Sequence, residues 1–218
     1  MDFDIMKVIK IDNNKISAQI IAKITRALKQ GEVVVYPTET FYGLGCDATN
    51  AQAVAKIFKI KGRQRNKALP FLVSDIKMAR KYLRFNRQAK MLAAKFWPGP
   101  LSLVLDFNAN GRKIFKKSIN QKSFDAGARI SSNKIAALLV KKLGKPLIST
   151  SANLSGWPAA SEAKTVIKYW QRRKFKPDVI IDAGKLPPSL GSTLVDARSG
   201  KIIILRKGDL ESIIKEGK

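Results

Sequence analysis

The chain has 218 residues, 45% of them hydrophobic, and this is enough to bury the core of one mixed domain without disulfide staples. It contains one cysteine, Cys46, and no histidine. This composition excludes an internal disulfide framework, Ser-His-Asp and Cys-His catalysis, and the common histidine-containing zinc sites. Lys and Arg number 42 against 16 Asp and Glu, which gives a formal net charge of +26. The charge favours polyanionic partners such as tRNA or double-stranded RNA, although lysines spread over solvated faces would give the same count.

The remaining chemistry must use lysine, arginine, hydroxyl groups and backbone amides, a set that suits phosphate-bearing substrates. We expect no metal site built from protein side chains. No apolar run approaches the roughly 18 to 20 residues of a membrane span. The start MDFDIM lacks the basic and then apolar order of a signal peptide. We therefore expect a cytoplasmic protein with no membrane partner.

The first predicted elements are an amphipathic helix and a short strand. Ser17 can cap the helix, in which apolar residues recur at helical spacing from Ile20 to Leu28, and Gly31 can end it. Residues Glu32 to Tyr36 then predict a valine-rich strand. Pro37 closes the strand because proline supplies no N–H to a continuing ladder.

Asn50 can cap a second helix, whose end carries the basic segment KGRQRNK at 61–67. The pattern then predicts a strand at 69–74, helices at 76–83 and 87–96, the breaker WPGP at 97–100 and a strand at 101–107. Residues 108–124 hold turn residues and lysines without a clear period, and we expect a mobile loop there.

The second half of the chain alternates the same two element types. It predicts a strand at 128–130, a helix from the cap Ser132 through Leu143 closed by Gly144, a buried strand starting at 146–150, a helix at 162–171, and strands at 179–182, 192–196 and 202–205. Because the alternation is irregular, a mixed, twisted α/β sheet is favoured over a regular parallel one. We expect a single domain over 1–218, with a core at 15–208 and a short C-terminal tail at 209–218.

Small, hydroxyl or basic residues gather where five predicted strands or helices end. The segments are PTETFYGLG (37–45), KGRQRNK (61–67), WPGPLS (97–102), STSANLSG (149–156) and GSTLVD (191–196). Ligands of α/β sheets usually bind beyond such ends. Taken singly, the first and fourth segments also suit ordinary turns, and the second suits a solvated basic surface.

Together and in this order, these segments and the later ILRKG (204–208) resemble the YrdC-type threonylcarbamoyl-AMP synthase family, in its short single-domain form. The resemblance implies an open, twisted mixed α/β sheet flanked by helices, with a concave basic cavity. It implies a nucleotidyltransferase that makes threonylcarbamoyl-AMP and pyrophosphate from L-threonine, bicarbonate and ATP. Mg²⁺ would accompany ATP, and a tRNA threonylcarbamoyl transferase complex would pass the group to an adenosine of tRNA.

The same resemblance implies a role for particular residues. Threonine binding falls on Thr38, Tyr42, Arg129, Ser149 and Ser192; nucleotide binding falls on Lys61, Arg63, Lys67, Ser151, Asn153 and Arg206; and the catalytic residues are Lys61 and Arg63. The chain departs from the family pattern at four positions. The family usually has proline at the positions of Gln64, Ala68 and Ser131, and threonine at that of Ser102. The third change removes the proline of an RxP segment that begins at Arg129.

Two rival interpretations remain open. The first is a non-catalytic RNA-binding protein that serves tRNA or ribosome maturation on the same fold. It predicts RNA affinity that falls steeply with salt and no release of pyrophosphate. The second is an acylphosphate or carbamoyl-transfer enzyme of related fold, which would act without threonine.

Overall fold

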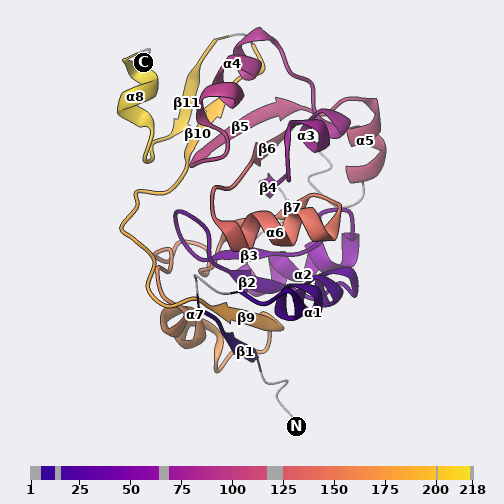
Figure 1. Cartoon of the computed structure of the whole chain (residues 1–218), viewed down its shortest axis with the longest axis vertical. Helices are drawn as coiled ribbons and strands as arrows, with labels where there is room; N and C mark the ends of the chain where they lie inside the picture. Colours follow the sequence, from indigo (N-terminus) through magenta and orange to yellow (C-terminus); the bar gives the residue numbers. More distant parts are fainter. Residues whose placement is uncertain (1–5, 13–15, 64–68, 117–124, 200, 217–218) are drawn as a thin grey trace.

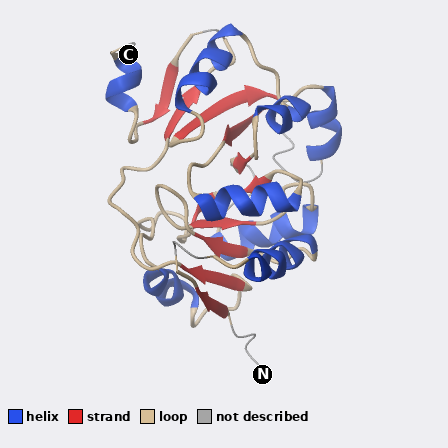
Figure 2. Ribbon diagram, in the orientation of Figure 1, coloured by secondary structure: helices blue, strands red, loops and turns tan. Residues whose placement is uncertain are grey.

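The structure is a computed structural model that describes residues 6–12, 16–63, 69–116, 125–199 and 201–216. These residues form two mixed sheets with helices around them (Figures 1 and 2). In chain order the elements are β1 (Lys7–Lys10), α1 (Ala18–Lys29), β2 (Val34–Tyr36), β3 (Gly43–Gly45), α2 (Ala51–Lys61), β4 (Phe71–Leu72), α3 (Ile76–Tyr82), α4 (Arg87–Phe96), β5 (Leu101–Asp106), α5 (Ala109–Phe115), β6 (Asp125–Arg129), α6 (Lys134–Leu143), β7 (Leu147–Ile148), β8 (Thr150–Ser151), α7 (Ala163–Trp170), β9 (Val179–Asp182), β10 (Thr193–Asp196), β11 (Ile203–Arg206) and α8 (Glu211–Lys215).

The predicted mixed α/β class is confirmed, and its strands are divided between two sheets. Within the described residues, one sheet has the order β1-β9-β2-β3-β8 and the other has the order β11-β10-β5-β6-β4-β7. Each contains parallel and antiparallel pairs. The chain passes directly from one sheet to the other at Ser149, because β7 pairs with β4 and β8 pairs with β3. The backbone N–H of Ser149 donates to the carbonyl of Pro70 at 2.9 Å and so fixes this crossing.

Helices α1 and α6 pack together over one face, where the apolar residues of both turn inward. Ser17 caps α1 as predicted, and its hydroxyl accepts from the N–H of Ile20 at 3.2 Å. The predicted cap of α6 at Ser132 is wrong by one residue. Asn133 caps this helix, because its side-chain oxygen accepts from the N–H groups of Ile135 and Ala136. Gly144 ends α6 in the left-handed conformation that the sequence suggests.

The loop expected at 108–124 is wrong over its first part. Asn108 caps a short helix, α5, which continues to Phe115. The buried Phe115 ring lies 5.5 Å from that of Phe71 and 5.2 Å from that of Phe107. Tertiary aromatic packing therefore stabilises a helix that is too short to show a period in the sequence. Residues 117–124 lie outside the described part of the chain.

Besides α5, three elements are absent from the sequence-based prediction. β1 lies before the expected core at 15–208 and pairs in parallel with β9. β3 is the Gly43–Gly45 end of the segment PTETFYGLG, and it pairs with both β2 and β8. α8 lies in the expected tail, where Ile214 is buried. Among the described helices, none is long and apolar enough to cross a membrane.

Gly45 is required by the close approach of β3 to its neighbours. A Cβ placed on it would lie 2.1 Å from the carbonyl oxygen of Ile148 and 2.9 Å from the ring of Tyr36. The hydroxyl of Tyr36 donates to the same Ile148 carbonyl at 3.1 Å. Any side chain at position 45 would therefore push β3 away from the strand that crosses between the sheets.

We predict that Gly45→Ala destabilises the protein by about 3 kcal/mol, because the clash is with backbone and cannot relax cheaply. This corresponds to a melting temperature lower by about 6 to 12 °C, measurable by circular dichroism. Gly144→Ala is the control, since its Cβ would meet nothing within 4 Å. It carries only the cost of a left-handed alanine, about 1 kcal/mol. Equal losses in the two variants would contradict the steric explanation.

Candidate functional site

A cavity of about 460 Å³ opens where the two sheets meet, and residues of both sheets line it. From the first sheet come Gly43 of β3 and Ser151 of β8. From the second come Phe71 of β4, Ser102 of β5 and Arg129 of β6. Val104 and Gly127, which lie within β5 and β6, also line it, so the cavity lies against a face of the second sheet and not only beyond strand ends as the motifs suggested.

The cavity collects the predicted site residues that fall within the described part of the chain. They are Thr38, Tyr42, Lys61, Arg63, Arg129, Ser149, Ser151, Asn153, Ser192 and Arg206. Lys67 lies outside the described residues. The structure thus brings these residues to one place, and their individual roles stay proposals.

Lys61 lies at the last position of α2, and its side chain is only 4% exposed. Its ammonium donates to the carbonyls of Ser151 and Asn153 at 2.7 and 2.9 Å, and to Asn153 Oδ1 at 3.0 Å. Three acceptors match the three N–H groups of a protonated lysine, whereas a neutral amine has two. Burial, followed by repulsion from Arg63, lowers the pKa of Lys61 to about 7. The cavity therefore contains a cation that can lose its charge near neutral pH.

The turn after β8 is built around Asn153. Its Oδ1 accepts from the hydroxyl of Ser151 at 2.7 Å as well as from Lys61, and its Nδ2 donates to the carbonyl of Trp157. The backbone N–H of Ser155 donates to the carbonyl of Lys61 at 3.0 Å. The basic segment and the serine-rich turn are consequently one connected unit.

The hydroxyls of Thr38 and Tyr42 already have protein partners. Thr38 Oγ1 donates to the carbonyl of Phe41 at 2.6 Å and accepts from the N–H groups of Thr40 and Phe41. Tyr42 donates to the carbonyl of Gly184 at 2.7 Å and accepts from the N–H of Ala183 at 3.0 Å. Burial raises the pKa of Tyr42 to about 12. Both side chains shape the cavity wall, and a ligand would meet them with these bonds already made.

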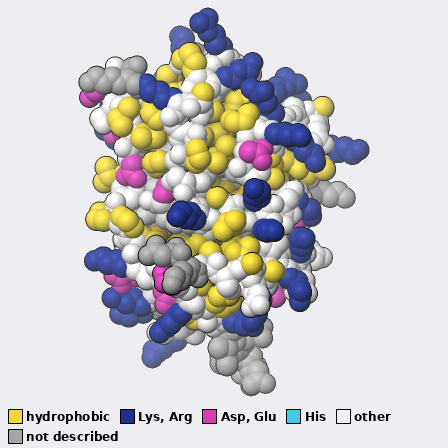
Figure 3. Space-filling view, in the orientation of Figure 1, with side chains coloured by type: hydrophobic (Ala, Val, Ile, Leu, Met, Phe, Trp, Pro, Cys, Tyr) yellow, Lys and Arg dark blue, Asp and Glu magenta, His cyan; other side chains and the backbone are white. Residues whose placement is uncertain are grey.

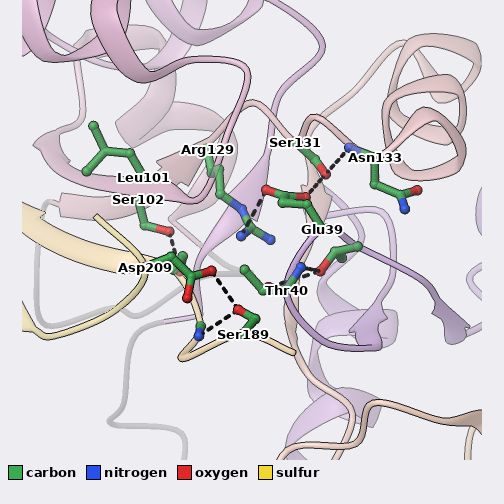
Figure 4. Close-up of polar contacts among 12 residues, drawn as sticks. Glu39, Thr40, Leu101, Ser102, Arg129, Ser131, Asn133, Ser189 and Asp209 are labelled. Carbon is green, nitrogen blue, oxygen red and sulfur yellow. Dashed lines mark hydrogen bonds and ion pairs between the residues drawn. The ribbon is translucent and has the colours of Figure 1, made fainter. Parts of the chain in front are cut away.

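Arg129, at the end of β6, is held by Glu39 and Ser131, neither of which the sequence predicted as a site residue (Figure 4). Its Nη1 lies 3.2 Å from Glu39 Oε1, outside hydrogen-bond geometry, and the side chains are 9% and 13% exposed. The other oxygen of Glu39 accepts from the hydroxyl of Ser131. Ser131 occupies the position of the proline in the family pattern, and here it anchors the carboxylate that faces Arg129. The presence of Glu39 in the segment PTETFYGLG is the sequence feature that could have pointed to its pairing with Arg129.

A second chain of polar contacts lies beside Arg129 on the neighbouring strands β5, β10 and β11 of the same sheet. Arg206 Nη2 donates to the carbonyl and the hydroxyl of Ser192 at 3.0 and 2.8 Å, and Ser192 Oγ lies 3.0 Å from Ser102 Oγ. The loop that precedes β10 is tied to the residues before α8, since Asp209 accepts from the Ser189 hydroxyl and from the Leu190 N–H. Figure 4 draws both the Ser102 contact and the Asp209 contact.

Gly208 is required next to these contacts for steric reasons. A Cβ on it would lie 2.4 Å from the carbonyl oxygen of Gly191 and 2.5 Å from the backbone nitrogen of Thr193. The strand that carries Arg206 therefore turns directly against the GSTLVD segment. This contact places Arg206 beside Ser192.

Four cationic side chains of the described residues line the cavity, Lys61, Arg63, Arg129 and Arg206. Partial burial lowers the pKa of Arg63, and burial followed by repulsion from Arg129 lowers that of Arg206. The carboxylates nearby are compensated, since Glu39 faces Arg129 and Asp125 pairs with Arg198. An anionic ligand would offset the repulsion between these buried positive charges, so the arrangement favours one. Among the described residues, no group of three or more His, Cys, Asp or Glu could hold a metal ion.

These features define an α/β protein with a cavity that is lined by cationic side chains and hydroxyl groups. The model of the Sua5, YciO and YrdC family, described as "Telomere recombination", matches residues 26–208, so the chain belongs to this family.

Curated relatives agree with this membership. Threonylcarbamoyl-AMP synthase of Pyrococcus abyssi is 32% identical over 84% of this chain and 52% of its own length. The putative threonylcarbamoyl-AMP synthase of Methanocaldococcus jannaschii is 32% identical over 93% of each chain. Threonylcarbamoyl-AMP synthase of Vibrio vulnificus is 36% identical over 86% of this chain and 98% of its own. The chain thus spans about half of the first relative and nearly all of the other two.

Solved structures share the fold. Pyrococcus abyssi Sua5 complexed with L-threonine superposes with a TM-score of 0.83 at 29% identity, over 97% of this chain and 60% of that one. Escherichia coli YciO superposes with a TM-score of 0.82 at 24% identity, over 95% and 98% of the two chains, and shows the fold alone. The family resemblance of the sequence motifs is therefore confirmed.

We predict that sulfate, whose charge is constant from about pH 6 to pH 9, binds less tightly as the pH rises through about 7. Lys61 then loses its charge, and we expect about a tenfold loss of affinity by calorimetry. Lys61→Arg keeps its charge over the whole range, so its profile should be flat. Indistinguishable sulfate profiles would contradict the lowered pKa.

The same lowered pKa predicts that the free energy of unfolding rises with pH between 7 and the ordinary lysine value of 10.5. The reason is that the unfolded chain holds a proton in this range that folded Lys61 lacks.

Proposed function

We propose that the protein is a threonylcarbamoyl-AMP synthase, which makes threonylcarbamoyl-AMP and pyrophosphate from L-threonine, bicarbonate and ATP. One observation carries the proposal: Lys61, Arg63, Arg129 and Arg206 line a single cavity that is also lined by the hydroxyl-rich turn at 149–153. A triphosphate and two carboxylate-like substrates need this combination of cations and neutral donors. The names of the curated relatives support the same activity.

The chemistry needs positioning and charge neutralisation more than a strong base, which fits a chain without histidine. The threonine amine attacks the carbon of bicarbonate, an N–C bond forms, and water is lost to give a carbamate. A carbamate oxygen then attacks the α-phosphorus of ATP. The bond from that phosphorus to the bridging oxygen breaks, and pyrophosphate leaves with the electron pair.

We assign the residues to these steps by their positions in the cavity. Arg129 is suited to the threonine carboxylate because it lines the cavity and Glu39 holds its guanidinium in one orientation. Arg63 and Arg206 are suited to the phosphates, on which charge develops. Lys61 supplies its charge from the cavity wall while it holds the turn at Ser151 and Asn153.

Mg²⁺ is proposed to arrive on the phosphates of ATP, where it would neutralise charge on the leaving pyrophosphate. This ion prefers oxygen ligands and usually keeps phosphate oxygens among them. The cavity wall offers the hydroxyl oxygens of Ser102 and Ser192, which lie 3.0 Å apart. These residues would contact the ion or its waters.

The product would pass to a tRNA threonylcarbamoyl transferase complex for threonylcarbamoyladenosine formation, and we propose the cytoplasm as the place where ATP and tRNA are available. Direct binding of tRNA belongs to the same proposal. Its support is the net charge of +26.

We predict that the purified protein releases pyrophosphate from ATP only when L-threonine and bicarbonate are both present. Arg63→Ala should lower kcat/KM by one to two decades, since loss of one charged partner costs about 1.5 to 3 kcal/mol. The control is Arg80→Ala, which removes an exposed arginine of α3. Release without threonine would favour a carbamoyl-transfer enzyme of another substrate class, and no release from protein that binds RNA would favour the non-catalytic interpretation.

We predict that Ser131→Ala raises KM for threonine about fivefold and changes kcat less, because Glu39 loses a donor and Arg129 loses its fixed direction. Initial rates of pyrophosphate release at varied threonine give both constants. Ser131→Thr retains the hydroxyl and should restore KM. A KM as high in Ser131→Thr as in Ser131→Ala would show that the hydroxyl has no part in aiming Arg129.

A further inference from the structure

An exposed surface of alternating basic and aromatic side chains lies outside the cavity, where the ends of α2 and α7 meet. We call it the basic aromatic surface. It consists of Lys59, Trp157, Arg173, Lys174 and Phe175. None of these side chains belongs to the cavity lining, and the proposed chemistry does not use them.

The two large aromatic side chains of this surface are open to solvent. Trp157 is 47% exposed and Phe175 is 43% exposed. The guanidinium of Arg173 lies 5.7 Å from the centre of the Trp157 ring, and the ammonium of Lys59 lies 5.6 Å from that of Phe175. Large exposed aromatics with a cation at each ring indicate a binding surface rather than ordinary packing.

The surface is held in shape by side-chain hydrogen bonds to the backbone. Trp170 at the end of α7 donates to the carbonyl of Ile60 in α2 at 3.0 Å. Tyr169 donates to the carbonyl of Pro158 at 3.2 Å, and its ring meets that of Trp157 edge to face at 5.1 Å. Arg173 Nε donates to the carbonyl of Tyr169 at 3.1 Å. A ligand would therefore bind a preformed surface and would not have to order it.

Positive charge predominates around this surface. Residues 155–176 contain six basic residues (Lys164, Lys168, Arg172, Arg173, Lys174 and Lys176) and one acid, Glu162. That acid is 2.6 Å from Lys164 and so is already compensated. In Figure 3, Lys and Arg side chains gather at the lower left, over the position of α7 in Figure 1. The local field thus favours a polyanion.

The surface adjoins the mouth of the cavity through one short loop. Ser155 and Gly156 line the cavity, and Trp157 follows them directly. The carbonyl of Trp157 accepts from Nδ2 of Asn153, the residue that also binds Lys61. A ligand on the surface would therefore lie beside the place where the nucleotide is proposed to bind.

We propose that the basic aromatic surface binds the unpaired bases of RNA. Bases would stack on Trp157 and on the guanidinium of Arg173, while Lys59, Lys174 and Phe175 would follow the adjoining backbone and base. An acidic peptide would use the cations but leave the two exposed aromatic faces without a role. A duplex hides its base faces inside the stack, so it would use the cations alone.

The test measures binding of a labelled 20-nucleotide oligouridylate and of a 20-base-pair RNA duplex to the full chain by fluorescence anisotropy. We expect the single strand to bind more tightly than the duplex. Trp157→Ala should weaken binding of the single strand about tenfold and leave duplex binding nearly unchanged. Arg173→Gln with Lys174→Gln should weaken both and lower the slope of log K against log salt by about 1.4 for the single strand.

The matched control is Lys81→Gln with Lys90→Gln, which removes the same charge from exposed positions on α3 and α4. Equal losses in the two double variants would assign RNA binding to the overall charge and overturn the proposal. Unchanged affinity in Trp157→Ala would also overturn it. Pyrophosphate release without RNA should be the same in Arg173→Gln with Lys174→Gln as in the parent chain, so this test stands apart from that of the synthase activity.

Discussion

The buried ammonium of Lys61 is the interaction on which the site depends. It joins the end of α2 to the carbonyls of Ser151 and Asn153, and the carbonyl of Lys61 in turn accepts from Ser155. Removing the ammonium would leave the buried carbonyl of Asn153 without its donor, and it would take one donor each from the carbonyl of Ser151 and from Asn153 Oδ1. The cost of an unsatisfied buried acceptor exceeds the net strength of an ordinary hydrogen bond. The helix end, the serine-rich turn and the loop that leads to Trp157 consequently keep one arrangement. A single lysine thus serves both the architecture of the cavity and its charge.

The second determinant is the passage of the chain between the two sheets. Because β7 and β8 are separated only by Ser149, the edges of the sheets are brought together without a long connection. Gly45 permits this approach by leaving room for the Ile148 carbonyl. The cavity lies between the two sheets and is lined by residues of both. Its cations then come from elements far apart in sequence, which is why Arg63, Arg129 and Arg206 meet although no local pattern relates them.

The sequence predicted the parts of the fold and of the site that local chemistry controls. As expected, Ser17 and Asn50 cap the starts of helices and Gly144 caps the end of one. The predicted site residues within the described part line one cavity. The rest depends on tertiary contacts. Helix α5 forms because Phe115 packs in an aromatic cluster, and the role of Glu39 becomes visible only when β6 brings Arg129 against it. Ser131 replaces the proline of the family pattern, and its hydroxyl donates a hydrogen bond to Glu39. Only the folded chain places these two residues together.

Gly208 has a consequence for how such sequences are recognised. The glycine that ends ILRKG is required by the nearness of the Gly191 carbonyl and the Thr193 nitrogen, and the proposed chemistry uses neither group. Natural selection for the fold alone would keep it, as it would keep Gly45. These signature glycines should therefore persist in descendants that have lost the original reaction or acquired another. The side chains that differ between such descendants, rather than the shared glycines, record which reaction each performs.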